Sequence, residues 1–133
     1  MARAFTFPGQ GSQSVGMGKA LAEAFPAARE VFEEVDDALS QKLSAMMFEG
    51  PMEDLTLTEN TQPALMANSV AVMRVLQAEG SLDIGAAAKF IAGHSLGEYS
   101  ALAAAGALDL GVTARLLKLR GQAMQTAVPA GEG

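Results

Sequence analysis

The amino-acid sequence predicts an α/β fold in which helices join parallel strands. One observation is a short strand-like run, residues 89–92, that stops at Gly93 and gives way to a helix-like run of small residues after Ser95. The other is a strand-like segment at residues 4–7, separated from the first by long stretches with helical spacing. Strands that alternate with helical stretches are typical of parallel sheets, because a parallel connection must cross back over the sheet.

The N-terminal segment predicts a strand, a loop and two helices. Residues 4–7 alternate as in a strand and end at Pro8, which cannot continue a central strand. A loop with two glycines, residues 8–13, leads to a helical segment with one apolar face, made of Ala20, Leu21, Ala24 and Phe25. Pro26 opens the next helix, whose apolar face is Val31, Phe32, Val35 and Leu39. The acidic residues between these positions predict a solvent-exposed face.

A long helix is predicted in the middle of the chain. Its start lies in residues 58–63, where Asn60 or Thr61 can cap the helix and Pro63 suits the first turn. Gly80 is expected to end it, because glycine favours the residue that follows a helix. Residues with helical spacing fill the interval, so this helix should contribute much of the core.

Two further helices are predicted after the second strand. The helix that follows Ser95 should run to about residue 105, where Gly106 stops it. Asp109 can cap the last helix. The residues expected to face inward on that helix are Leu110, Ala114, Leu117 and Met124.

Length and composition narrow the class of protein. A chain of 133 residues, half of them hydrophobic, is sufficient for one globular domain. The absence of cysteine excludes disulfides and a thiol nucleophile and fits a cytoplasmic protein. A net charge of −6 argues against nucleic-acid binding, and no apolar run is long enough for a membrane span or a signal peptide. No metal site is predicted.

The Gly93-x-Ser95-x-Gly97 pattern predicts a nucleophile elbow, a sharp strand-to-helix turn that exposes a serine hydroxyl. Glycines are required because a side chain at either position would collide with the neighbouring strand or helix. Ser95 is therefore the candidate nucleophile. The backbone N–H of Leu96 is the expected first donor to an oxyanion, and the loop after the first strand is placed to supply a second.

No residue of the sequence makes a convincing general base for Ser95. His94 is the only histidine, and adjacent side chains on an elbow diverge, so we expect it to line the pocket or to pack. Glu98 lies on the first turn after the serine, and Asp109 is explained as a cap. Arg120 has two interpretations that spacing leaves open: a cation at a helix C-terminus, or a fork for a substrate carboxylate.

Four motifs together resemble a known enzyme family. They are Phe7-Pro8-Gly9-Gln10-Gly11-Ser12-Gln13, Thr61-Gln62-Pro63-Ala64-Leu65, Gly93-His94-Ser95-Leu96-Gly97-Glu98-Tyr99-Ser100-Ala101-Leu102 and Arg120-Gly121. In this order they resemble the malonyl-CoA:acyl carrier protein transacylases of fatty acid synthesis and the related acyltransferase domains of polyketide synthases. The resemblance covers essentially the whole chain.

The resemblance implies a mechanism and a set of site residues. Ser95 would form a malonyl-serine ester with malonyl-CoA and then pass the malonyl group to the phosphopantetheine thiol of acyl carrier protein. The backbone amides of Gln10 and Leu96 would hold the oxyanion, and Arg120 would pair with the malonyl carboxylate. Gln62 would line the pocket, and His94 would contact the acyl group. No cofactor is implied.

The resemblance also implies how the chain is organised. Enzymes of this family are larger, with an α/β-hydrolase-like sheet, a small ferredoxin-like subdomain and a catalytic histidine in a later part of the sequence. Residues 1–128 would be the N-terminal part of the large subdomain, and residues 129–133 would begin the connection to the small one. The chain alone is therefore expected to be inactive, and the full-length enzyme is expected to be a monomer.

Acyl carrier protein is acidic, so a binding site for it requires a local basic patch on this acidic chain. Lys118 and Arg115 are the candidates.

Two other classes of function stay open at this point. A serine esterase, thioesterase or patatin-like lipase shares the elbow but gives no role to Arg120. A non-catalytic module that binds coenzyme A or a carrier protein fits a chain without a base. The preference for malonyl or methylmalonyl is also open. The choice between a synthase domain and a free-standing enzyme is open as well, and the initial methionine favours a free-standing enzyme.

Overall fold

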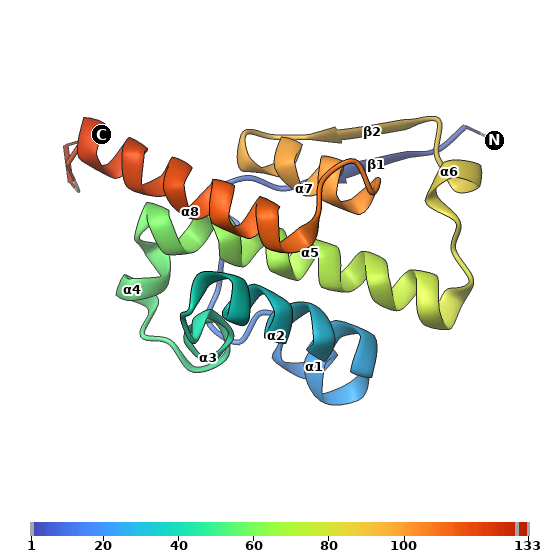
Figure 1. The fold of residues 1–133 in the computed structure, drawn as a ribbon, viewed down its shortest axis with the longest axis horizontal. Coiled ribbons are helices and arrows are strands. Elements are labelled where there is room, and N and C mark those ends of the chain that lie inside the picture. The colour runs from blue at the N-terminus through green and yellow to red at the C-terminus, as the bar shows by residue number, and fades with distance from the viewer. Residues whose placement is uncertain (1, 130, 133) are drawn as a thin grey trace.

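The computed structural model describes residues 2–129 and 131–132 of the chain. In chain order the elements are β1 (Ala4–Phe7), α1 (Lys19–Ala24), α2 (Pro26–Leu39), α3 (Leu43–Glu49), α4 (Met52–Thr56), α5 (Thr58–Gly80), α6 (Ile84–Ala87), β2 (Phe90–Gly93), α7 (Leu96–Ala104) and α8 (Leu110–Ala127) (Figure 1). The two strands pair in parallel, from Ala4 with Phe90 to Phe7 with Gly93. The predicted mixed α/β architecture with parallel strands is thus confirmed for this pair.

Helix α5 is the central element of the structure. It contacts α2, α7 and α8, and α7 in turn packs against both strands (Figure 1). The first turns of α5 are buried on every side, from Asn60 to Ala67. A helix that is buried all round belongs to the core and not to the surface. The predicted role of this helix is confirmed, and it supplies the base on which α7 and α8 lie.

The two-stranded sheet is covered on one face only. Phe7 is buried with Met73, Ile84 and Ala101, in a small cluster that joins the sheet to α5 and α7. On the other face the side chain of Phe90 is 69% exposed. Parallel sheets in α/β proteins are normally covered on both faces, so the outer face of this sheet is uncovered apolar surface.

Several predicted boundaries are confirmed. Helix α2 buries Val31, Phe32 and Val35, as its spacing indicates. Gly106, with φ +79°, follows the end of α7, and the Asp109 carboxylate accepts a hydrogen bond from Val112 N at 3.2 Å at the start of α8.

Other details of the prediction are wrong. Helix α5 begins at Thr58, so Asn60 and Thr61 lie inside it, and their side chains donate to the carbonyls of Asp54 and Leu55 instead of capping it. On α1 it is Ala22 that is buried, whereas Ala20 and Ala24 are exposed. Met124 on α8 is 43% exposed and so is not buried as expected, although its Sδ contacts the buried Gln62.

None of the helices within the described residues is both long and apolar enough to cross a membrane. The connection predicted at residues 129–133 lies partly outside the described residues, which omit 1, 130 and 133.

Candidate active site

Ser95 lies in the sharp turn between β2 and α7, with φ 56° and ψ −110°. A non-glycine residue in the left-handed region is strained and is found mainly where the surroundings enforce it. A Cβ on Gly93 would lie 1.9 Å from the carbonyl carbon of Gly97, and a Cβ on Gly97 would lie 2.4 Å from the carbonyl oxygen of Phe7. The expected steric requirement for both glycines is confirmed, and the turn has the geometry of a nucleophile elbow.

The loop after β1 lies against this elbow. A Cβ on Gly9 would approach Nδ1 of His94 to 2.5 Å and the His94 carbonyl oxygen to 2.8 Å, and His94 N donates to Phe7 O at 3.1 Å. Gln10 and Leu96 therefore follow adjacent strands at the same edge of the sheet. Among the described residues, no hydrogen bond uses the backbone N–H of either Gln10 or Leu96. Within the described part of the chain, both N–H groups are therefore without a hydrogen-bond partner.

Arg120 reaches Ser95 from helix α8. Its Nη2 donates to Ser95 Oγ at 3.1 Å, and its Nη1 donates to Gln62 Oε1 at 2.8 Å. The guanidinium lies over the ring of Tyr99, with 5.5 Å between Cζ and the ring centroid. Within the described part of the chain, Arg120 forms no ion pair with a carboxylate. The cation is half-buried, next to Ser95, and its described partners are neutral.

The position of Arg120 depends on its neighbour Gly121. Helix α8 crosses α5 so closely there that a Cβ on Gly121 would lie 2.6 Å from Glu59 Cα. The helix then continues to Ala127, so Arg120 lies within it, and the interpretation as a helix C-terminal cation is wrong. Sequence reasoning names Gly121 and Tyr99 within motifs but gives neither residue a role. The signals for them are a glycine directly after the arginine and an aromatic residue one helical turn after the serine.

Gln62 lies behind Arg120. It is only 1% exposed, its Oε1 accepts from Arg120, and its Nε2 donates to Met124 Sδ at 3.1 Å. These contacts orient the guanidinium, while direct contact between Gln62 and a substrate stays a prediction. His94 is exposed and faces Gly9, and no hydrogen bond of the described residues joins it to Ser95.

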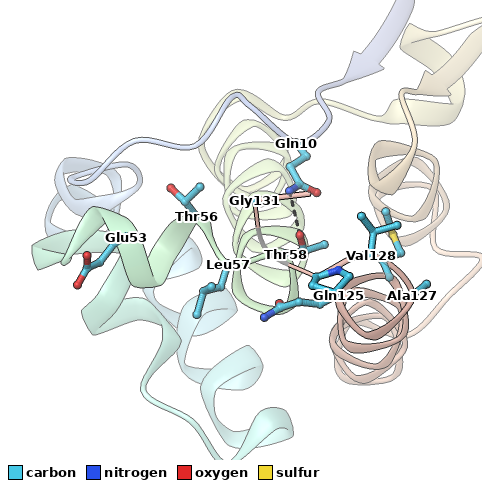
Figure 2. Close-up of a pocket in the computed structure, with 11 residues that line it drawn as sticks. Gln10, Glu53, Thr56, Leu57, Thr58, Gln125, Ala127, Val128 and Gly131 are labelled. Atoms are coloured by element: carbon cyan, nitrogen blue, oxygen red, sulfur yellow. Dashed lines mark hydrogen bonds between the residues drawn. The ribbon is translucent and has the colours of Figure 1, made fainter. Parts of the chain in front are cut away.

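A pocket of about 590 Å³ opens beside the site, between the loop after β1, the α4–α5 junction and the end of α8 (Figure 2). Gln10 lies at one wall, where its side-chain amide donates to Thr58 Oγ1 at 3.2 Å (Figure 2). Met124, the partner of Gln62, lines the other wall. The pocket is therefore lined by Gln10, from the loop that packs on the elbow, and by Met124, which contacts the Arg120 partner Gln62.

The two cations suggested for a carrier-protein patch differ in the structure. Lys118 lies against Glu59 at 3.3 Å and donates to Gln41 Oε1 and Asn60 Oδ1 at 3.0 and 2.9 Å. Lys118 is therefore engaged in contacts within the fold. Of the two candidate residues, only Arg115 is exposed. Among the described residues no group of three or more histidines and carboxylates could hold a metal ion.

Comparison with known proteins identifies the family. The model of the acyl transferase domain family matches residues 4–133. The chain is 53% identical over 130 residues to the malonyl CoA-acyl carrier protein transacylase of Bacillus subtilis (strain 168) and 50% identical to that of Escherichia coli (strain K12). In each case 98% of this chain is covered, but only 39% and 41% of the relative.

Comparison with solved structures identifies relatives of the same kind. The acyl-carrier-protein-S-malonyltransferase from Bartonella henselae is 66% identical, with a TM-score of 0.94 over 96% of this chain and 40% of that one. A malonyl-transacylase solved in complex with a type II PKS acyl-carrier protein is 49% identical, with a TM-score of 0.90 over 98% of this chain and 41% of that one. The chain thus spans about 40% of the length of the relatives it matches. It belongs to the acyl transferase domain family, and its relatives there are malonyl-CoA:acyl carrier protein transacylases.

Proposed function

We propose that this chain supplies the nucleophile, the oxyanion donors and the carboxylate-binding arginine of a malonyl-CoA:acyl carrier protein transacylase. Ser95 Oγ attacks the thioester carbonyl of malonyl-CoA and loses its proton to a base, and the thiol of coenzyme A leaves. The phosphopantetheine thiol of acyl carrier protein then attacks the malonyl-serine ester and regenerates the serine. The reaction needs no cofactor, and a chain without cysteine fits a cytoplasmic location.

The observation that carries this proposal is the Arg120 guanidinium beside Ser95, which has no carboxylate partner among residues 2–129 and 131–132. A half-buried cation among neutral groups gains most from a ligand that brings a negative charge. A simple esterase has no use for such a group.

The distance between Arg120 and Ser95 also limits the length of the acyl group. Nη2 is already within hydrogen-bonding distance of Ser95 Oγ, at 3.1 Å. A carboxylate bound to this guanidinium must therefore lie close to the ester that Ser95 forms. In a malonyl group a single carbon separates the carboxylate from the carbonyl, which suits this short reach better than a longer dicarboxylic acyl group.

Two unpaired N–H groups support the assignment of the oxyanion hole. The tetrahedral intermediate carries a negative oxygen, and Leu96 N donates to it from the N-terminus of α7, where the helix dipole favours negative charge. Gln10 N donates from the loop that packs on the elbow through Gly9. We assign the second donor to Gln10 on this basis.

The general base is assigned to a histidine outside these 133 residues, because His94 is the only histidine here and faces Gly9. By the same proposal, residues 1–128 are part of the large subdomain, with an α/β-hydrolase-like sheet, and residues 129–133 lead toward a small ferredoxin-like subdomain. The uncovered sheet face around Phe90 supports further elements packing there.

The test is a chimera in which this chain replaces the aligned residues of the Bacillus subtilis relative, assayed for transfer of malonyl from malonyl-CoA to acyl carrier protein. The chimera should be active, and Ser95→Ala should abolish transfer. The isolated chain should show no transfer. A chimera that folds but shows no transfer would contradict the proposal, and so would transfer that survives Ser95→Ala.

A further inference from the structure

Three groups hold the Arg120 guanidinium, and they act in different directions. Gln62 Oε1 and Ser95 Oγ accept hydrogen bonds from Nη1 and Nη2, at 2.8 and 3.1 Å. N–H donors of a guanidinium lie in its plane, so these two contacts fix the group within that plane. They leave it free to tilt about the line that joins the two nitrogens.

The guanidinium also lies over the Tyr99 ring, with the ring centroid 5.5 Å from Arg120 Cζ. That separation is within the range in which a cation is attracted to an aromatic face. Tyr99 is half-buried on α7 and packs against the main core cluster, so the ring itself has little freedom. Attraction to a ring that is itself held restrains the guanidinium where the two hydrogen bonds leave it free to move.

The Tyr99 contact also differs from the others in its relation to the reaction. In the acyl-enzyme, Ser95 Oγ becomes an ester oxygen, so the hydrogen bond that it accepts from Arg120 must change. The contact with the Tyr99 ring involves no reacting atom. It is therefore a contact that holds the guanidinium in both the empty and the acylated site.

Ser95 and Tyr99 lie one helical turn apart, at the entry to and on α7. The same short helix therefore carries the nucleophile and the platform for the cation. Any movement of α7 shifts both together and preserves the distance between them. Arg120 itself comes from α8, and its alignment with Ser95 depends on a contact that α7 supplies.

We infer that Tyr99 is a positioning residue for Arg120, whose ring holds the guanidinium in the position at which it receives a substrate carboxylate beside Ser95. This inference rests on the proposed function, because it takes Arg120 as the carboxylate-binding group. The ring face makes the contact, so phenylalanine should replace tyrosine and an aliphatic residue should not.

The experiment measures binding and does not need a catalytic base. The ¹⁵N-labelled chain is titrated by NMR with monomethyl malonate, which carries one carboxylate, and with dimethyl malonate, a neutral control with the same carbon chain. The variants are Tyr99→Phe, Tyr99→Leu, Tyr99→Met and Arg120→Ala. A second readout is the upfield ring-current shift of the Arg120 side-chain protons in the unliganded protein.

The wild-type chain should bind monomethyl malonate and not dimethyl malonate, and Arg120→Ala should remove that difference. Tyr99→Phe should keep the affinity and the ring-current shift. Tyr99→Leu and Tyr99→Met should lose the shift and bind about tenfold more weakly, as expected for a partly desolvated cation–π contact. Signals of α5 and α8 should stay in place in the folded variants.

Separate results overturn the inference and the proposed function. A wild-type chain that does not distinguish the anion from the neutral ester contradicts the proposed function and the inference with it. A wild-type chain that does distinguish them, together with aliphatic variants that bind equally well, contradicts the inference alone. If both aliphatic variants fail to fold, the wild-type shift decides, and its absence refutes the inference.

Discussion

Two cations lie two positions apart on helix α8 and have opposite surroundings. Lys118 is 3.3 Å from the carboxylate of Glu59 and donates to two further side-chain oxygens, on Gln41 and Asn60. Arg120 donates to an amide and a hydroxyl and lies on an aromatic ring, with no carboxylate among its described partners. Both cations reach toward α5, and both are half-buried.

The difference separates a structural cation from one that is available to a ligand. The charge of Lys118 is compensated within the fold, and its contacts tie α8 to α5 and to the connection between α2 and α3. The charge of Arg120 is not compensated by the described residues, although its orientation is fixed. A group that is oriented but not neutralised is ready to bind an anion without rearrangement.

The sharpest test of this contrast is Arg120→Ala in the chimera with the Bacillus subtilis relative. We expect the ratio of kcat/KM for malonyl-CoA to that for acetyl-CoA to fall roughly 100-fold, because two charge-assisted hydrogen bonds to the carboxylate are lost. Turnover of acetyl-CoA should not fall with it. An unchanged ratio would remove Arg120 from the carboxylate site.

Gly121→Ala tests whether the close crossing of α8 and α5 places Arg120. The new Cβ would lie 2.6 Å from Glu59 Cα, so the helices must separate, at a cost of about 1–3 kcal/mol in the free energy of unfolding. The malonyl-to-acetyl ratio should fall as well. Urea denaturation and the chimera assay give the two measurements.

Gly111→Ala is the matched control on the same helix. A Cβ there would have its nearest neighbours at 3.4–3.5 Å, two of them the ends of flexible side chains. We expect unchanged stability or a gain of up to about 1 kcal/mol from the better helix propensity of alanine. Equal losses in both glycine variants would mean that the crossing at Gly121 has no special role.

Lys118→Met should have the reverse profile of Arg120→Ala. Loss of the contacts with Glu59 and its neighbours should lower the free energy of unfolding by about 1 kcal/mol, because the pair is only partly shielded from water. The malonyl-to-acetyl ratio should not change. A fall in that ratio comparable with that of Arg120→Ala would end the distinction between the two cations.

Ser100→Ala extends the comparison to hydroxyl groups and has the smallest expected effect. The Ser100 hydroxyl is buried on α7 without a hydrogen-bond partner, unlike that of Ser95. Its removal should raise the free energy of unfolding by up to about 1 kcal/mol. Ser44→Ala, which removes a hydroxyl that donates to Asp36, should lower it instead.

The elbow could be predicted from the sequence because its causes are local. Gly93 and Gly97 are required by collisions within a few residues and with one neighbouring strand, so their spacing around Ser95 carries the information. The cap of α8 at Asp109 is local in the same sense. Motif resemblance added Gln10 and Arg120, whose roles no local pattern specifies.

The rest of the site could not be predicted because it depends on how helices cross. Spacing alone is equally consistent with both interpretations of Arg120. The structure distinguishes them, because α8 continues past Arg120 and touches α5 at Gly121. The burial of Gln62 likewise follows from that crossing. The start of α5 was misplaced because the side chains of Asn60 and Thr61 bond to the preceding helix, a tertiary contact that capping rules do not include.

The contacts of the site also differ in the length of chain that they close. The turn at Ser95 is fixed within the elbow and by the strand β1 beside it, whereas the hydrogen bond between Gln62 and Arg120 joins two helices across 58 positions. Long-range contacts form late and open first when an element at the edge of a fold detaches. Under the proposed function, a molecule that loses the docking of α8 would keep Ser95 in its turn but lose the cation that recognises a carboxylate.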